Sequence, residues 1–206
     1  MELIKFGHST IAMQAPEGRI LIDPGSATDS ACLQDADAVL LTHIHPDHFD
    51  VDAVKASGLP VWGPQDVADK LGETKGDCTV VESGDEFEVL GLRIRAVGGR
   101  HHPIHPEVPR PVNLGYLAEG VLHPGDEFIT ELPGEVRTLL LPIAGPWARG
   151  TEAADYAREL SPEMVVPIHD AVLSEFGQNF TDNVLGNKLA LPGYFRPELG
   201  QPFEAK

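Results

Sequence analysis

The segment from residue 42 to residue 48, THIHPDH, concentrates the side chains most able to do chemistry. It places three histidines and one aspartate within six consecutive positions. Residues two apart in an extended backbone project to the same side, so His43 and His45 can reach a single cation. A proline then turns the chain, which lets Asp47 and His48 point toward a second cation, at the roughly 3.5–4 Å separation that two-metal hydrolases use.

A polar loop whose histidines only form hydrogen bonds is the alternative for this segment. Crowding three imidazoles and a carboxylate into six positions is electrostatically costly unless cations hold them together. We therefore expect the segment to bind metal ions.

Strands and helices must position these side chains. The cluster directly follows an apolar strand-like run at residues 38–42 and precedes a helix-compatible pattern at residues 50–56. Strands are also expected at residues 3–6, 9–13, 19–22, 60–62, 78–81, 86–97, 112–119, 136–141 and 164–168, and further helices at residues 65–71, 151–160 and 173–189.

The composition is typical of a soluble globular protein. The chain has 206 residues, of which 42% are hydrophobic and 23% charged, and this length fits one domain over residues 1–206 better than two. The net charge of -17 disfavours non-specific binding to nucleic acids or anionic membranes. Cys32 and Cys78 form no CxxC pair, and no secretory leader or long apolar stretch is evident, so we expect a cytoplasmic protein.

The pattern HxHxDH after a hydrophobic strand resembles the signature of the metallo-β-lactamase superfamily. Members of that superfamily supply a third histidine for the first metal, an aspartate that bridges both metals, and a last histidine for the second metal. Each of these lies on a loop after a strand. Candidates in matching order and spacing are His101, Asp126 and His169.

This resemblance implies a site for two divalent metal ions. It assigns the first metal to His43, His45 and His101, the second metal to Asp47, His48 and His169, and the bridge to Asp126. Imidazole and carboxylate ligands suit Zn²⁺ and also accommodate Mn²⁺ or Fe²⁺. The implied fold is α/β, a four-layer αββα sandwich with the metals at one edge where the loops converge.

The activity implied is metal-dependent hydrolysis. A hydroxide that bridges the metals would attack a carbonyl or phosphoryl centre of a small metabolite, such as a lactone, amide, thioester or phosphoester. Asp47 would be the catalytic residue, because it can orient that nucleophile and shuttle its proton. The sequence has no GxSxG elbow, Walker loop or GxGxxG motif, and a redox diiron member of the superfamily would carry Glu in place of His45.

Two other functions are compatible with these residues. One is a metal-dependent phosphodiesterase or nuclease, and the other is a non-catalytic metal-binding scaffold or sensor of the same fold. The absence of a basic patch argues against a nucleic-acid partner. The expected partner is a small-molecule substrate, with no nucleic acid and no membrane, and a homo-oligomer is compatible with the sequence.

The N-terminal segments are similar to one branch of the superfamily. Gly7–Thr10 (GHST) and Ile20–Pro24 (ILIDP) resemble strands of the branch that includes ascorbate-6-phosphate lactonase and N-acyl-phosphatidylethanolamine phospholipase D. The chain departs from that branch at Pro142–Trp147 (PIAGPW), where lactonase-like members show a Gly-His-Phe type of segment.

Several further residues have two interpretations at this stage. His102 directly follows His101 and is the alternative third ligand of the first metal. His8 could face the metal site or be a buried structural histidine. Trp147 could line the substrate pocket or the core, and His105 could contact substrate or only hydrogen-bond within its loop.

Three more residues are expected to support the structure without binding metal. Asp23, at a strand end, should orient a ligand or hold a loop. His123 is expected to be a strand-end residue, and Trp62 a core residue.

Overall fold

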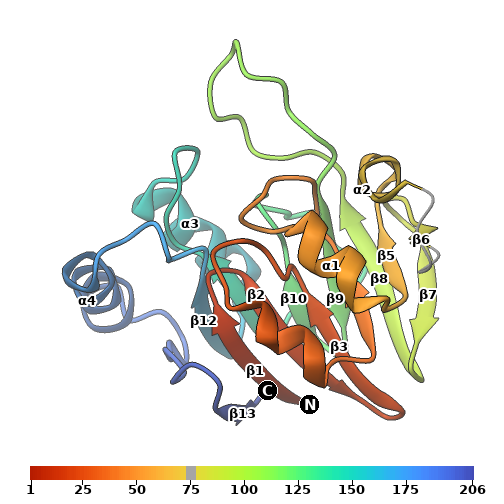
Figure 1. Ribbon diagram of the computed structural model, residues 1–206. Helices are drawn as coiled ribbons and strands as arrows, with labels where there is room; N and C mark the ends of the chain where they lie inside the picture. Colours follow the sequence, from red (N-terminus) through yellow and green to blue (C-terminus); the bar gives the residue numbers. More distant parts are fainter. Residues whose placement is uncertain (73–77) are drawn as a thin grey trace.

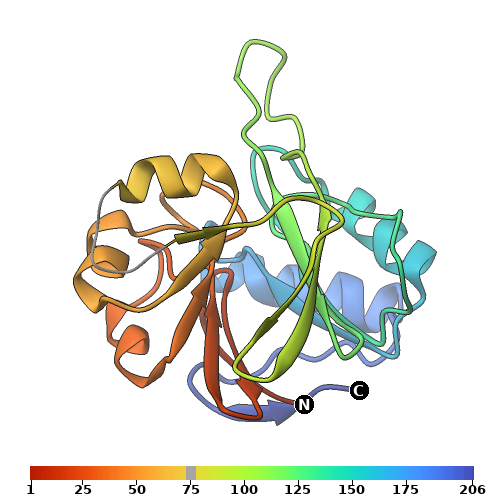
Figure 2. The same ribbon diagram turned by 90° about the vertical axis from the view of Figure 1, so that its right-hand side faces the viewer.

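The computed structural model describes residues 1–72 and 78–206, which form two sheets that face each other, with helices outside both (Figure 1, Figure 2). The first sheet contains β1 (Glu2–Gly7), β2 (Thr10–Ala15), β3 (Gly18–Ile22), β4 (Ala38–Leu40), β5 (Val61–Gly63), β6 (Cys78–Val80) and β13 (Pro202–Glu204). Its spatial order is β13-β1-β2-β3-β4-β5-β6. The second sheet contains β7 (Glu86–Val89), β8 (Leu92–Gly98), β9 (Leu114–Ala118), β10 (Val121–His123), β11 (Thr138–Pro142) and β12 (Met164–Ile168). Its order is β12-β11-β10-β9-β8-β7.

The helices form the two outer layers (Figure 2). They are α1 (Val51–Ser57), α2 (Gln65–Leu71), α3 (Gly150–Leu160) and α4 (Glu175–Asp182), together with a 3₁₀ helix at Ser30–Asp35 and a π-helix at Asn183–Lys188. Helices α1 and α2 cover the first sheet, and α3 covers the second. The predicted four-layer αββα sandwich is confirmed.

Three apolar clusters join these layers. Leu3 and Ile94, from opposite sheets, belong to the cluster between the sheets. Val54 of α1 packs in the cluster outside the first sheet, and Ala153 of α3 packs in the one outside the second. Burial of apolar surface at roughly 25 cal/mol per Å² in these three layers is what holds the strand ends in fixed positions.

The strand directions bring the chemistry to one edge. Strands β3, β4 and β5 are parallel neighbours, as are β10, β11 and β12. Because the carboxyl ends of parallel strands meet at the same edge of a sheet, the loops that follow β3, β4, β10 and β12 converge there. The loop after β8 reaches the same region and, at residues 99–113, extends beyond the body of the molecule (Figure 1, Figure 2).

Two expected strands are in fact hairpins. The strand predicted at residues 86–97 divides into β7 and β8, because Leu90 and Gly91 adopt φ values of 52° and 74° and form a turn. The apolar run from Tyr116 to Leu122 divides in the same way into β9 and β10, at Glu119 and Gly120 with φ of 47° and 79°. Apolar residues lie on both sides of each turn, so the apolar run did not show where one strand ends and the next begins.

Other differences lie at the termini and in short helices. The helix predicted at residues 173–189 is α4 followed by the π-helix, and the 3₁₀ helix and β13 were not predicted. Strand β13 adds to β1 and brings the two chain ends together. Within the described ranges, no helix combines the length and apolar character needed to cross a membrane.

Candidate metal centre

Two groups of potential ligands lie at this edge. The first cluster consists of His43, His45, His101 and Asp126, and the second cluster consists of His8, Asp47, His48 and His169. Within each cluster, one ligand atom from every member lies within 4.8 Å of the others. The structure thus brings all seven predicted ligands together and adds His8.

The turn after β4 is shaped by close backbone contacts. The main-chain N–H groups of His48 and Phe49 both donate to the carbonyl of His45, at 3.0 and 2.9 Å. The loop after β3 lies directly against this turn, because a Cβ on Gly25 would stand 1.9 Å from the carbonyl oxygen of Asp47. Glycine at residue 25 is therefore needed to bring the two loops together.

Each buried histidine of the turn after β4 has its Nδ1 next to an acceptor. His48 Nδ1 lies 2.7 Å from Asp23 Oδ2, and His43 Nδ1 lies 2.9 Å from Thr42 Oγ1. The Thr42 hydroxyl donates to Asp23, so its oxygen can accept from His43. We therefore assign the proton of each ring to Nδ1, which leaves Nε2 with a free lone pair.

The two histidines from the second sheet also have Nδ1 next to an acceptor. His101 Nδ1 lies 2.5 Å from the carbonyl oxygen of His102, and His169 Nδ1 lies 2.5 Å from that of Ala144. A carbonyl can only accept, so both rings are protonated at Nδ1. Four histidines thus turn an unprotonated Nε2 toward the same centre.

That centre contains Asp126, which reaches both clusters. Its Oδ2 lies 3.2 Å from His101 Nε2 and 3.1 Å from His169 Nε2, and its Oδ1 lies 3.1 Å from His48 Nε2. Within residues 1–72 and 78–206, the buried atoms without a hydrogen-bond partner include His48 Nε2, His169 Nε2 and Asp126 Oδ1. The lone pairs of these imidazole nitrogens and of the carboxylate oxygens repel one another unless a cation lies between them. This set of donor atoms therefore fits divalent metal ions.

The pKa values of the buried groups reflect strong coupling between the imidazoles and the carboxylates. Burial opposes a charge on His48, but Asp126 and Asp23 raise the pKa of this ring well above its usual range, so a cation next to Nε2 would take the place of a proton there. Burial lowers the pKa of His43 well below its usual range, and a charge on His48 would lower it further. Burial opposes the charged form of Asp126 as well, but His48 and His169 hold its pKa well below the ordinary value. The carboxylate of Asp47 likewise has a lowered pKa, because the His8 hydrogen bond and the charge of His48 outweigh its burial.

Asp23 and His123 have the supporting roles that were expected of them. The Asp23 carboxylate is fully buried and accepts hydrogen bonds from His48 Nδ1 and from the main-chain N–H and hydroxyl of Thr42. His123 Nε2 bonds to the carbonyl of Ser9 at 2.8 Å, and His123 lies in neither cluster. Asp23 therefore fixes the ring of His48 in the second cluster, whereas His123 fixes a strand end.

The structure also separates His101 from its neighbour. The side chain of His102 packs against Phe128 and Trp147, and only its main-chain N–H reaches Asp126, at 2.8 Å from the carbonyl oxygen. His101 is the histidine whose ring enters the first cluster. His105 is exposed in the loop at residues 99–113, where its Nδ1 accepts from the main chain of Glu107.

Trp147 touches the centre with a polar atom. Its indole N–H donates to Asp126 Oδ2 at 3.0 Å, and its ring lies between those of His101 and His169, with centroids 5.8 and 5.6 Å away. Only 6% of Trp147 is exposed, so it supports the site from within. Trp62 packs against the core between the sheets.

Sequence reasoning missed a buried ionic network behind His169. Lys5 is 1% exposed, and its ammonium group donates to the carbonyl of Pro167 at 2.7 Å and to Asp170 Oδ2 at 2.6 Å. Arg196 also donates to Asp170, and it pairs with Asp182 at 2.6 Å. No motif marks Lys5, because its partners lie more than 160 positions away in the chain.

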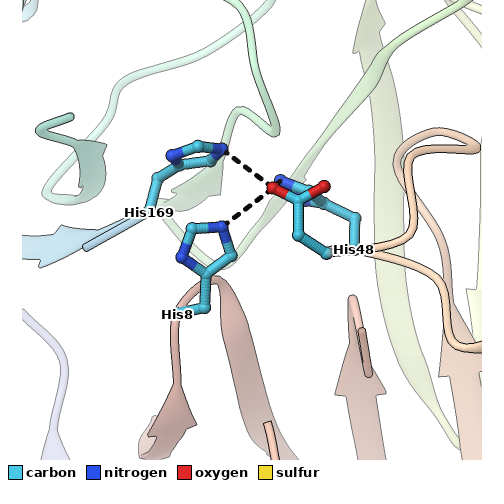
Figure 3. A group of neighbouring side chains, drawn as sticks. His8, His48 and His169 are labelled. Atoms are coloured by element: carbon cyan, nitrogen blue, oxygen red, sulfur yellow. Dashed lines mark hydrogen bonds and ion pairs between the residues drawn. The ribbon is translucent and has the colours of Figure 1, made fainter. Parts of the chain in front are cut away.

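Three residues of the site adopt a left-handed backbone. His8, Asp23 and His169 have φ values of 32°, 50° and 56°. This conformation is unfavourable for residues other than glycine, and it persists where the surroundings impose it. Figure 3 shows the side chains of His8, His48 and His169 directed toward one another.

Comparison with known proteins agrees with this geometry. Residues 2–169 match the beta-lactamase superfamily domain. The Mycobacterium tuberculosis protein Rv0786c is 36% identical over 187 residues, covering 84% of this chain and 86% of that protein. A UPF0173 metal-dependent hydrolase from Thermococcus onnurineus is 31% identical over 183 residues, covering 79% of this chain and 81% of that protein.

A solved structure shows the same fold. Igni18, a metallo hydrolase from the archaeon Ignicoccus hospitalis, superimposes with a TM-score of 0.74 at 24% identity, over 100% of this chain and 99% of that one. The predicted similarity to the branch of ascorbate-6-phosphate lactonase stays a prediction. The family match over residues 2–169 shows that the chain belongs to the metallo-β-lactamase superfamily.

Proposed function

We propose that this protein is a dinuclear metal-dependent hydrolase of a small metabolite. The observation that carries the proposal is the convergence of four Nε2 atoms, those of His43, His48, His101 and His169, around the buried carboxylate of Asp126, while the Nδ1 of each ring lies next to another acceptor. The name of the Thermococcus onnurineus relative, a metal-dependent hydrolase, supports it.

The two clusters would hold one divalent ion each. His43, His45 and His101 would hold the first ion, and Asp47, His48 and His169 the second, with Asp126 shared between them. Zn²⁺ suits this nitrogen-rich set, and Mn²⁺ or Fe²⁺ are also compatible with it. When bound, such ions supply a hydroxide nucleophile at neutral pH and polarise the carbonyl or phosphoryl oxygen that is attacked.

Asp47 is the residue best placed to act on the nucleophile. Its side chain is 37% exposed, whereas the side chains of His43, His48 and Asp126 are 0–2% exposed, so Asp47 lies at the solvent side of the centre. Its lowered pKa keeps the carboxylate ionised at neutral pH, and an ionised carboxylate can accept a hydrogen bond from an attacking water. Asp47 therefore orients the nucleophile through its carboxylate oxygens.

The substrate class is proposed from charge and from the resemblance. A net charge of -17 disfavours nucleic acids and anionic membranes, and the lactonase-like features of the N-terminal strands make lactones the first class to test. Amides, thioesters and phosphoesters react by the same attack and form the rest of the set. A cytoplasmic location and a homo-oligomeric state belong to this proposal as well.

The test is a metal analysis combined with a substrate screen. Purified protein should contain about two divalent ions per chain, and it should hydrolyse one of these four classes. His101→Ala should lose the first ion and the activity. His102→Ala changes the next histidine, whose ring packs on Phe128 and Trp147, and should retain both ions.

Two outcomes would favour the alternatives. Two bound ions without hydrolysis of any class would favour a metal-binding scaffold. Cleavage of RNA, with binding that weakens as salt increases, would favour a nuclease, and cleavage of phosphodiesters with no activity on the other classes would favour a phosphodiesterase.

A further inference from the structure

His8 belongs to the second cluster but differs from the other two histidines of that cluster in how its ring is hydrogen-bonded. It occupies the turn between β1 and β2 and is 2% exposed. Its Nε2 lies 3.1 Å from Asp47 Oδ2, and its Nδ1 lies 3.2 Å from the main-chain nitrogen of Ala171. Each ring nitrogen of His8 therefore already has a partner from the protein.

These two contacts fix where the ring carries its proton. The main-chain N–H of Ala171 can only donate, so Nδ1 must accept and cannot carry a proton. A neutral imidazole then has its proton on Nε2, which points at the carboxylate of Asp47. This tautomer is the reverse of the one in His48 and His169, whose Nδ1 atoms donate.

The position of its proton distinguishes His8 from the candidate metal ligands. A protonated Nε2 has no lone pair for a metal ion, whereas the Nε2 atoms of His48 and His169 do. The main chain of His8 has a second role, because its carbonyl accepts a hydrogen bond from the N–H of His169 at 3.0 Å. One residue thus holds both Asp47 and His169, which come from loops of different sheets.

We propose that His8 is a positioning residue, which orients the Asp47 carboxylate through its Nε2–H and does not bind metal. This inference rests on the proposed function, since it takes Asp47 to be a ligand of the second ion. Asp47 needs such a support because it is the exposed member of the cluster and is free to turn toward solvent. The left-handed backbone of His8, with φ of 32°, fits a turn held in place by these three contacts.

Two substitutions test separately the contacts that the His8 ring makes with Asp47 and with Ala171. In His8→Gln the side-chain amide nitrogen stands close to the position of Nε2 and can still donate to Asp47. In His8→Asn the amide lies close to the position of Nδ1, where it can satisfy the N–H of Ala171 but cannot reach Asp47. His105→Asn, in the exposed loop, is the matched control for the loss of a histidine.

The main measurement is zinc affinity by competition with a chromophoric chelator. Loss of a group that orients a ligand typically weakens metal binding by about 10–100-fold. We expect such a loss for the second zinc ion in His8→Asn, a change of less than about threefold in His8→Gln, and no change in His105→Asn. Thermal unfolding of the metal-free variants should confirm that each one folds.

A second readout is the tautomer itself, from long-range ¹H–¹⁵N NMR spectra of protein labelled at histidine. His8 should keep its proton on Nε2 both in the metal-free protein and after zinc is added. Loss of that proton on zinc binding, or an equal loss of affinity in His8→Gln and His8→Asn, would show that His8 is a ligand and overturn the inference. Unchanged affinity in His8→Asn would overturn it too.

The wild-type protein distinguishes a failure of this inference from a failure of the proposed function. If the wild type bound no second zinc ion, the dinuclear hydrolase would be refuted, and the positioning role would fall with it. If the wild type bound two zinc ions but His8 behaved as a ligand or had no effect, only the positioning role would be refuted.

Discussion

The first and second clusters use the same kinds of ligand, but different parts of the chain support them. In the first cluster, His101 is held by the carbonyl of His102, and Asp126 by the indole of Trp147. In the second cluster, His48 is held by the buried carboxylate of Asp23, and Asp47 by the ring of His8. Neutral groups thus contact the first cluster directly, whereas the buried carboxylate of Asp23 contacts His48 of the second cluster directly and His43 of the first only through Thr42.

The two clusters also differ in the parts of the chain that lie next to them. The first is attached to the loop at residues 99–113, whose base is closed by hydrogen bonds from His101 N–H to Pro111 and from the Arg110 guanidinium to the carbonyl of His101 (Figure 1). The second is backed by the ionic network of Lys5, Asp170, Arg196 and Asp182. We therefore expect distant substitutions to weaken the second ion more than the first.

The largest effect is expected where the clusters meet. Asp126→Asn replaces one carboxylate oxygen with an amide group and removes the negative charge that both clusters share. We expect fewer than about one bound ion per chain and the loss of nearly all hydrolysis, because an amide is a poor ligand for Zn²⁺. Metal analysis by mass spectrometry, with circular dichroism to confirm folding, is the measurement. Two ions in this variant would mean that Asp126 does not join the clusters.

A substitution at Asp23 should weaken the second cluster more than the first. In Asp23→Asn, His48 Nδ1 and the hydroxyl of Thr42 lose their charged acceptor, and we expect the affinity for the second ion to fall by about 10–100-fold. Chelator competition should show a smaller loss for the first ion, because His43 contacts Asp23 only through the hydroxyl of Thr42. Asp37→Asn is the matched control, because Asp37 accepts from the main chain of Arg19 at an exposed position. Equal weakening of both ions would remove the distinction between the clusters.

Features that a short stretch of sequence determines could be predicted, whereas features that depend on distant residues could not. The HxHxDH segment is contiguous, and it lies between an apolar strand and a helix, so its residues could be assigned from types and spacing together with the family resemblance. The four layers followed from the same resemblance. The hairpin turns at residues 90–91 and 119–120 were missed because apolar residues lie on both sides of each turn and read as one continuous run.

The supports of the site were harder to predict, because their contacts are not local. Lys5 is a single polar residue in an apolar strand, and its partner Asp170 lies 165 positions away. Arg196 and Asp182 lie beyond residues 2–169, the range that matches the family. The tautomer of His8 depends on the N–H of Ala171, which only the folded chain brings near. The residues of the two clusters could therefore be predicted to lie together, whereas the groups that orient them required the structure.

A smaller effect is expected at Trp147 and would sharpen the comparison from the side of the first cluster. Trp147→Phe retains an aromatic ring between His101 and His169 but removes the N–H that donates to Asp126 Oδ2. Loss of one such hydrogen bond costs about 1–2 kcal/mol, or roughly a 5–30-fold weaker interaction. Zinc competition should show the loss in both ions, because Asp126 Oδ2 lies next to His101 of the first cluster and His169 of the second. A loss confined to the second ion would mean that Trp147 supports His169 and not Asp126.

The smallest effect is expected at the outer end of the ionic network, where it should depend on pH. Burial opposes the charge of Asp182, but hydrogen bonds from Arg196 and Tyr194 lower its pKa below the ordinary 3.8. A carboxylate with a lowered pKa in the folded state stabilises the protein fully above about pH 4, and this stabilisation is lost as the pH falls through the lowered value. Asp182→Asn should therefore reduce the free energy of unfolding by about 1–2 kcal/mol near neutral pH.

The difference between the wild type and Asp182→Asn should narrow as the pH is lowered from about 4 toward 2, because the wild-type carboxylate is then protonated as well. Urea unfolding of the metal-free proteins at several pH values measures this directly. In zinc competition, Asp182→Asn should weaken the second ion by a few-fold and leave the first unchanged, since Arg196 connects Asp182 to Asp170 beside His169. A stability difference that stays constant down to pH 2, or an effect on the first ion, would show that the network does not support the second cluster through the charge of Asp182.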